Sequence, residues 1–231
     1  MKSQQTIAIV GDGRVGRALT AALRHAGLPV NGPHGRGYGG ADADAVLLCV
    51  PDAEIVAAAA AIVPGPLVGH CSGATGLDAL APHEAFGLHP LMTVPHTGAQ
   101  FAGAGAAVAG TTERARDLAT RLAQQLGMRP FPLDEDDRAA YHAGAAMASN
   151  FLVTLEEAAR RVSGLDRELL LPLVQASVDN WATDGVASLT GPIARGDEAT
   201  VARHREAIAE RAPDLLELYD ALADATRAVA A

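Results

Sequence analysis

Long apolar runs are missing from this sequence. Nearly half of its 231 residues are hydrophobic, yet the wholly aliphatic stretches are short, and no segment could span a bilayer. The N-terminus carries one lysine, a polar Ser3-Gln4-Gln5 and only a brief apolar run, which does not resemble a signal peptide. These absences predict a cytoplasmic protein with no membrane partner.

Cysteine is also scarce. Cys49 and Cys71 are the two cysteines, and both lie in apolar or strand-like contexts. They are expected to be buried free thiols of a cytosolic protein rather than a disulfide. No spacing of histidine, cysteine or acidic residues resembles a zinc or iron site, so no metal is expected.

A basic patch is absent as well. Residues 1–131 hold nine basic and nine acidic side chains, whereas residues 132–231 hold nine basic and eighteen acidic ones, which accounts for the net charge of −9. An acidic half without a basic patch argues against nucleic acid or an anionic membrane as a partner. The shift in composition predicts two domains, residues 1–131 and residues 132–231.

What the sequence does contain is a glycine motif close to its start. A β-branched run, Thr6 to Val10, is followed by Gly11-Asp12-Gly13-Arg14-Val15-Gly16 and then by a helical pattern. In a strand–turn–helix unit Gly11 permits the tight turn, Gly13 lets the backbone approach a pyrophosphate, and Gly16 lets the helix lie close to the sheet. Arg14 and Val15 begin the helix whose free N–H groups would face the phosphates. The alternative is a glycine turn with a structural role alone.

The acidic residue that usually binds the ribose hydroxyls of NAD is missing. Leu28-Pro29-Val30 is expected to form the second strand, and Asn31 stands at the usual position of the acid. The glycine-rich loop that follows offers His34 and Arg36, and an arginine there can pair with a 2′-phosphate. NADP is therefore favoured over NAD, with a flexible surface arginine as the alternative.

Strands and helices alternate up to residue 131. This pattern predicts an α/β fold with a mostly parallel sheet. No helix fits between Val30 and Asp44, so the second crossover is expected to be trimmed. The expected strands are residues 28–30, 44–50, 67–70, 85–88, 106–109 and 128–131, with helices at 53–62 and 112–126.

The ends of these strands carry the candidate site residues. Ligands bind at the carboxyl edge of such sheets. A simple turn is the alternative for Ser72 and Gly73, and a structural loop histidine is the alternative for His89. The cofactor candidates at this edge are Val50, Pro51, Asp52, Ser72 and Gly73, and the catalytic candidate is His89, in a loop that the following proline would fix.

From residue 134 onwards the pattern is helical only. The acidic residues 134–137 are expected to cap a long helix that runs to about Val162. Apolar residues recur on this helix at steps of three and four, which predicts a core-facing stripe from Tyr141 to Val162. Further helices are expected at 166–183, 198–210 and 213–229, with a long interruption at 185–197.

The helical half supplies the remaining candidates. His142 can donate a proton near neutral pH, and Asn150, two turns later, can hold a carbonyl or carboxylate. A histidine at a helix–helix contact is the alternative for His142. In the 185–197 loop Thr190 and Arg195 are the substrate candidates, with Arg195 as an anion anchor. The alternative for Arg195 is a surface ion pair.

Four motifs resemble those of one protein group. They are His70-Cys71-Ser72-Gly73, Leu88-His89-Pro90-Leu91, Tyr141-His142 through Ser149-Asn150-Phe151, and Leu189-Thr190-Gly191-Pro192 through Arg195-Gly196-Asp197. The chain resembles Rossmann-like proteins with a C-terminal domain of unknown function, within the 6-phosphogluconate dehydrogenase-like superfamily. The resemblance implies a Rossmann-type domain, an all-helical C-terminal domain and an NADP-dependent oxidoreductase. Hydroxyacid dehydrogenases of the superfamily carry a catalytic lysine one helical turn before an asparagine. If Asn150 matches that asparagine, Ala146 stands at the position of the lysine.

These observations lead to two functional hypotheses. The first is an NADPH-dependent reductase of a small, anionic carbonyl or imine compound; because some relatives reduce ketopantoate, a 2-keto acid is one candidate. The second is an NADP(H)-responsive binding protein without turnover, which the absent lysine favours. Small-residue faces and few aromatics in the helical half predict a homodimer through that half, as superfamily relatives form.

Overall fold

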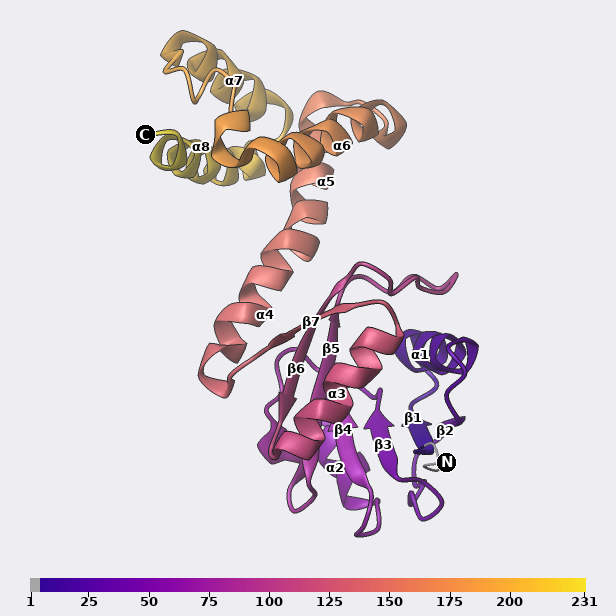
Figure 1. The fold of residues 1–231 in the computed structure, drawn as a ribbon. Helices are drawn as coiled ribbons and strands as arrows, with labels where there is room; N and C mark the ends of the chain where they lie inside the picture. Colours follow the sequence, from indigo (N-terminus) through magenta and orange to yellow (C-terminus); the bar gives the residue numbers. More distant parts are fainter. Residues whose placement is uncertain (1–4) are drawn as a thin grey trace. The chain divides into compact units, whose positions relative to one another are not determined.

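Residues 5–231 are described here from a computed structural model (Figure 1) and contain a seven-stranded sheet ordered β2-β1-β3-β4-β5-β6-β7. Neighbouring strands run parallel, except that β6 runs antiparallel to β5. This confirms the predicted α/β class with a mostly parallel sheet. The strands are β1 (Ile7–Val10), β2 (Val30–His34), β3 (Ala45–Leu48), β4 (Leu67–His70), β5 (Ala85–Leu91), β6 (Gly105–Gly110) and β7 (Arg129–Pro132).

Helices cover both faces of the sheet. On one face α1 (Arg14–His25) and α3 (Glu113–Gln125) bury their apolar sides together with Ile7, Ile9 and Leu47. On the other face α2 (Ile55–Ala60) and the 3₁₀ turns η1 (Asp52–Glu54) and η2 (Leu77–Leu80) border a second cluster. Since β3 is buried on both sides, its four residues are all apolar, as expected for a central parallel strand.

The second strand lies further along the chain than predicted. β2 begins at Val30 and continues through Gly32-Pro33 to His34, so Asn31 and His34 belong to a strand and not to the following loop. β2 is an edge strand, where a proline does not interrupt the sheet. Residues 35–44 join β2 to β3 without a helix, which confirms the trimmed crossover.

Gly69 and Phe86 are paired neighbours on β4 and β5. The Phe86 ring is fully buried, and a methyl group built on Gly69 would lie 2.4 Å from its Cε2 atom. Glycine in the middle of a strand is unfavourable by itself. Here it provides the volume that the aromatic ring fills.

The C-terminal part is helical, as predicted, and the chain divides into two compact units between Met147 and Ala148. The composition shift at residue 131 marks the change from strands to helices, whereas the compact units divide later. The elements are η3 (Glu135–Asp137), α4 (Arg138–Ala146), the π-helical turn η4 (Met147–Phe151), α5 (Leu152–Ser163), α6 (Arg167–Asp184), η5 (Gly185–Ser188), α7 (Glu198–Arg211), η6 (Pro213–Leu215) and α8 (Leu216–Ala230).

Two details of these helices differ from the prediction. The expected single helix to Val162 is interrupted by the π-helical turn η4. The acidic residues at its start do not cap it: Asp134 and Asp137, at the N-cap positions of η3 and α4, make no side-chain cap bond, and Glu135 binds Arg138. Asp197 caps α7, since its carboxylate accepts a hydrogen bond from the backbone N–H of Thr200 at 3.0 Å.

The predicted apolar stripe is not buried within the single chain. Ala148 is exposed and Leu155 is 40% exposed, and in the described chain α6 contains no buried residue.

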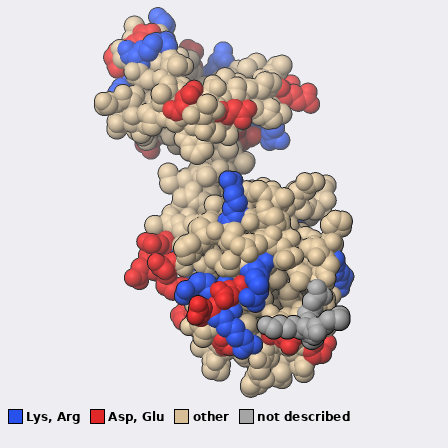
Figure 2. Space-filling model, in the orientation of Figure 1, with Lys and Arg blue, Asp and Glu red and all other residues tan. Residues whose placement is uncertain are grey.

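On the face drawn in Figure 2, acidic and basic side chains lie interspersed over the surface. No helix among residues 5–231 combines the length and the apolar character that crossing a membrane requires.

Candidate cofactor and catalytic site

The three glycines of the turn after β1 meet three different surroundings. Gly11 has φ +112°, and a methyl group built on it would lie 2.3 Å from the carbonyl oxygen of Cys49. A methyl group on Gly16 would lie 1.9 Å from the carbonyl oxygen of Gly11, so the helix start packs tightly onto the turn. Gly13 has no described atom within 4 Å of its missing Cβ. Gly11 and Gly16 therefore permit the turn and the close packing of the helix, and of the three positions Gly13 alone has open space.

The N-terminus of α1 faces this turn without a side-chain cap in the described chain, because its N-cap is Gly13. Its backbone N–H groups are therefore available to an anion. A cavity of about 580 Å³ lies beside them, lined by Gly13, Arg14 and the 95–98 segment among others. The Asp12 carboxylate in its wall is paired with Arg17 through two 2.7 Å hydrogen bonds, which lower its pKa and offset its charge. Val15, next on the helix, is half-buried against the core.

A smaller cavity of about 210 Å³ lies beyond the ends of β1 and β3. Its wall includes Arg36 and Glu54, whose side chains form a 2.5 Å ion pair, and the Arg36 side chain is 84% exposed. Val50, Tyr38 and Val10 provide apolar lining. The guanidinium predicted to bind a 2′-phosphate is thus at a cavity wall, but it is paired with a carboxylate that the sequence reasoning did not consider.

His34 takes a different position from Arg36. Its ring stacks on Tyr38 with centroids 3.8 Å apart, and its Nε2 atom is buried without a hydrogen-bond partner among the described residues. The Tyr38 hydroxyl donates a hydrogen bond to Asp42, and burial raises the pKa of Tyr38 to about 12. The role of His34 in cofactor binding stays a prediction.

The Ser72 hydroxyl is fully used within the turn after β4. It donates a hydrogen bond to the Asp52 carboxylate at 2.9 Å and accepts the N–H groups of Ala74 and Thr75 at 3.1 and 2.9 Å. Asp52 follows Pro51 after β3, so this contact joins the two adjacent strand ends. The turn, which was the alternative for Ser72, therefore accounts for its hydrogen bonds.

His70 also stabilises the turn after β4. Its Nδ1 atom accepts the N–H of Ser72 at 3.2 Å, and its Nε2–H donates to the carbonyl of Gly76 at 3.3 Å. Burial lowers the pKa of this fully enclosed ring. His70 is thus a neutral, structural histidine.

His89 lies inside a strand, not in a loop. The prediction was wrong because the antiparallel pairing of β5 with β6 continues past Pro90 to Leu91. The Nδ1 atom of His89 is 2.5 Å from the hydroxyl of Tyr141, and the two rings meet edge to face. Burial, with smaller contributions from His142 and Arg138, lowers the pKa of His89 to about 4. The ring is therefore neutral at physiological pH.

Gly73 brings the candidate side chains together. A methyl group built on it would lie 2.9 Å from Cε1 of His89 and 3.1 Å from Cδ2 of His142. Three residues proposed from sequence, Gly73, His89 and His142, therefore meet at the ends of β4 and β5. Tyr141 joins them, and burial raises the pKa of its hydroxyl.

Sequence reasoning missed two members of this cluster. Tyr141 was placed in the apolar stripe, although its position next to His142 in a motif was an available signal. Arg138 is 5% exposed and binds Glu135 through hydrogen bonds of 3.0 and 2.7 Å. Its buried charge helps to keep His70 and His89 unprotonated. No local pattern around Arg138 predicts that burial.

The other candidates belong to the second compact unit. Asn150 is an exposed residue of the π-helical turn, a feature that is frequent at functional sites. Arg195 is exposed, and its guanidinium donates a hydrogen bond to the carbonyl of Thr190, within its own loop. The roles of Asn150, Thr190 and Arg195 stay predictions.

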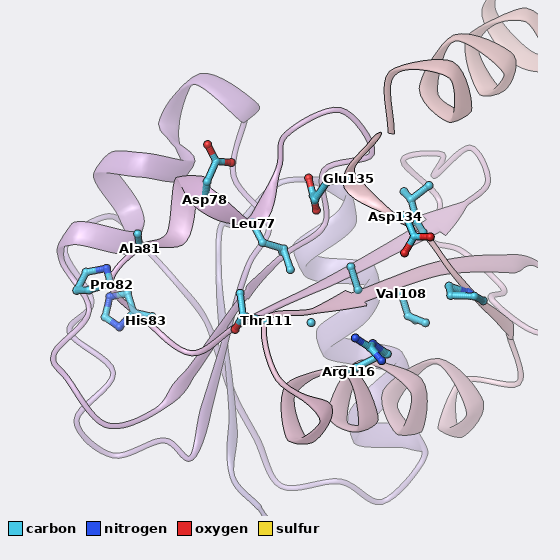
Figure 3. Close-up of a pocket in the computed structure, with 14 residues that line it drawn as sticks. Leu77, Asp78, Ala81, Pro82, His83, Val108, Thr111, Arg116, Asp134 and Glu135 are labelled. Carbon is cyan, nitrogen blue, oxygen red and sulfur yellow. The ribbon is translucent and has the colours of Figure 1, made fainter. Parts of the chain in front are cut away.

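A separate cavity of about 840 Å³ opens beside η2 over β6 and β7 (Figure 3). Pro82, His83 and Thr111 in its lining lie near the amino end of β5, whereas His89 is near the carboxyl end. It is therefore distinct from the cavities beside the glycine turn. Among residues 5–231 no group of three or more histidine, cysteine or acidic side chains could hold a metal ion.

The arrangement defines a Rossmann-like domain followed by a helical domain. A model of the Rossmann-like domain matches residues 37–95, and the domain of unknown function DUF2520 matches residues 105–226, more than half of the chain. The protein belongs to this DUF2520 family, which confirms the family resemblance. No curated protein matches the sequence.

Solved structures share the fold over nearly the whole chain. A "putative NADP oxidoreductase" from Bacteroides fragilis superimposes with a TM-score of 0.80 at 18% identity, covering 97% of this chain and 98% of its own. A Thermotoga maritima protein has a TM-score of 0.79 at 23% identity with the same coverage. A reductive aminase from Aspergillus terreus, in complex with NADPH and ethyl levulinate, has a TM-score of 0.63 at 18% identity, covering 97% of this chain and 94% of its own. At these identities the likeness concerns the fold.

Proposed function

We propose that this protein is an NADPH-dependent reductase of a small carbonyl or imine compound. The observation that carries the proposal is the open position at Gly13, before an uncapped helix N-terminus. A histidine–tyrosine pair lies on the same domain, at the ends of neighbouring strands. The Bacteroides and Aspergillus proteins, which are named for NADP chemistry, support the cofactor assignment.

The glycine turn would hold the pyrophosphate. The N–H groups of α1 and the space at Gly13 suit two phosphates, and Arg14 borders the same cavity. Arg36 would bind the 2′-phosphate after leaving Glu54. An exposed ion pair of this kind contributes at most about 1 kcal/mol, so a phosphate can compete for the guanidinium. NADPH, when bound, supplies the hydride.

Tyr141 would supply the proton. Because burial raises its pKa, the hydroxyl stays protonated at neutral pH. We assign the proton of the neutral His89 ring to Nδ1, so that it donates to the phenol oxygen and leaves the phenol proton directed to a substrate. His89 then acts as a positioning residue. His142, beside Gly73, is the other candidate donor.

The same cluster supports the proposed substrate class. A hydroxyl donor suits the oxygen of a carbonyl or the nitrogen of an imine as negative charge or basicity develops there. A small 2-keto acid such as ketopantoate is one candidate, with Arg195 and Thr190 as the proposed anion contacts. The Aspergillus reductive aminase supports testing imines alongside keto acids.

NADPH oxidation with a panel of keto acids and imines tests the proposal. On the best substrate, Tyr141→Phe should lower kcat about 100-fold, the usual size of a general-acid contribution, with KM nearly unchanged. Tyr219→Phe is the matched control, because Tyr219 also contacts a histidine, at 2.9 Å from His204, in the second unit. A loss of kcat in His142→Ala but not in Tyr141→Phe would assign the proton to His142.

Tight NADPH binding without oxidation by any compound of the panel would instead support the NADP(H)-responsive binding protein. Ala146, where superfamily dehydrogenases carry a lysine, favours that second candidate. Calorimetry of NADPH binding, run alongside the kinetics, separates the two.

We also propose a homodimer formed through the second compact unit. Leu169, Leu173 and Trp181 on α6 are each 66% exposed, and a largely apolar groove of about 520 Å³ separates α5 from α6. Large exposed apolar areas mark interaction surfaces, and a symmetric pair is the commonest assembly. Light scattering at micromolar concentration should give twice the chain mass of 23.6 kDa. Leu169→Glu should shift the protein to the monomer, and a monomeric unmutated protein contradicts the proposal.

A further inference from the structure

The two cysteines of the chain lie side by side under the glycine turn. Cys49 and Cys71 each follow the last paired residues of β3 and β4, Leu48 and His70, which are in register. Their sulfur atoms are 3.7 Å apart, and both thiols are free and half-buried. The sequence predicted free thiols but not that they face each other.

This placement suits a covalent bond between them. Neighbouring strands lie about 4.8 Å apart, which is within the Cα separations that disulfides span. The sulfurs must approach from 3.7 Å to about 2.05 Å, a movement that side-chain rotation and a small backbone shift can supply. The contact with the Cys49 thiol and burial raise the pKa of Cys71, so Cys71 stays protonated and is a poor first nucleophile toward an oxidant.

We propose that Cys49 and Cys71 form a reversible disulfide when the protein meets a peroxide. The Cys49 sulfur attacks one peroxide oxygen, which gives a sulfenic acid and releases one water. The Cys71 sulfur then attacks the sulfenic sulfur, forms the S–S bond, and a second water leaves. The two thiols lose two protons and two electrons, and hydrogen peroxide is reduced to two water molecules.

The bond would act on the neighbouring turn. The Cys49 carbonyl borders Gly11, and the Cys49 Cβ atom lies 3.3 Å from where a Cβ of Gly16 would be. Any movement of Cys49 toward Cys71 is therefore transmitted to both glycines. This consequence rests on the proposed function: the oxidised protein should bind NADPH about tenfold more weakly than the reduced protein.

Oxidation of the whole chain with dilute hydrogen peroxide tests the bond directly. Because the sequence holds two cysteines, the expected result is loss of both free thiols and an intact mass about 2 Da lower. A thiol reductant such as dithiothreitol should restore both. Peptide mapping should give one crosslinked peptide pair within a single chain.

Other products overturn the proposal. A mass gain of about 16 or 32 Da on Cys49 or Cys71 in the peptide map, a crosslink between two chains, or two thiols that persist would each show that the pair does not close. Cys71→Ala is the matched variant: it should lose the 2 Da product and bind NADPH equally before and after peroxide. Circular dichroism checks that it is folded, and the thiol count on the unmutated chain does not depend on the variant.

Measuring NADPH binding by the oxidised and the reduced protein distinguishes a failure of the proposed function from a failure of the proposed coupling. If the disulfide forms but neither redox state binds NADPH, the proposed function fails while the modification site stands. If both states bind NADPH equally, the coupling to the glycine turn is wrong.

Discussion

Acidification should destabilise the protein through one histidine. In the folded state the pKa of His89 is about 4, whereas an unfolded histidine has a value near 6.5. Between these two values the unfolded chain binds more protons than the folded one. Stability conferred by the neutral ring is therefore complete above about pH 6.5 and is lost as the pH falls toward 4.

The size of the effect follows from the same two values. At about 1.4 kcal/mol per pH unit, the free energy of unfolding should fall by roughly 3 kcal/mol between neutral pH and pH 4. This is an upper value, because a mostly but not fully buried ring is partly screened. It is still a large share of the 5–15 kcal/mol typical of folded proteins.

Urea unfolding of the unmutated protein and of His89→Asn, across this pH range, isolates the contribution. Asparagine keeps a hydrogen-bonding atom near the position of Nδ1 but does not titrate. Between neutral pH and pH 4, the free energy of unfolding of the unmutated protein should fall by about 2–3 kcal/mol more than that of the variant. The contributions of other titrating groups, His70 included, cancel in the comparison. His25→Gln, at an exposed helix end, is the control and should follow the unmutated protein. Curves for His89→Asn and the unmutated protein that run parallel within about 0.5 kcal/mol would refute the reasoning.

Three further predictions concern ligand binding. Gly13→Val should lower NADPH affinity at least about 100-fold while the free energy of unfolding changes by less than about 1 kcal/mol, because the backbone there is extended and the space is open; calorimetry and urea unfolding check both. Arg36→Ala should lower the affinity for NADPH about tenfold and leave the affinity for NADH unchanged. Arg114→Ala, which removes a comparable exposed ion pair at α3, should change neither affinity. An unaltered ratio of NADPH to NADH affinity in Arg36→Ala would mean that Arg36 does not bind the phosphate. Arg195→Ala should raise KM for an anionic substrate about tenfold with cofactor affinity kept, and an unchanged KM in steady-state kinetics would exclude it as the anchor.

Local patterns were sufficient for much of the fold. The apolar run around Val46 and the glycine spacing after Val10 predicted a buried central strand and the turn, because each depends on neighbours within a few residues. The absence of a crossover helix was also predictable, since too few residues separate Val30 from Asp44 for a helix. Helices α6, α7 and α8 begin and end close to the predicted positions for the same reason.

Long-range contacts decided the parts that sequence reasoning missed. Pro90 suggested a loop, yet pairing with Ala106 on β6 keeps it in a strand. Tyr141 looked like a core residue until the fold placed it against His89, 52 positions earlier. The acidic residues 134–137 were expected to cap the helix, but Glu135 pairs with Arg138 instead. Each outcome depends on a partner that local periodicity does not identify.

The pairing of Gly69 with Phe86 bears on how this family can vary. Because the ring occupies the volume that the glycine leaves, the two positions share one space and cannot enlarge independently. Gly69→Ala should be strongly destabilising alone, and Phe86→Leu should recover part of the loss, which a double-mutant cycle would register as coupling. Across relatives, a larger residue at position 69 should therefore accompany a smaller one at position 86, so that the pair evolves as a unit.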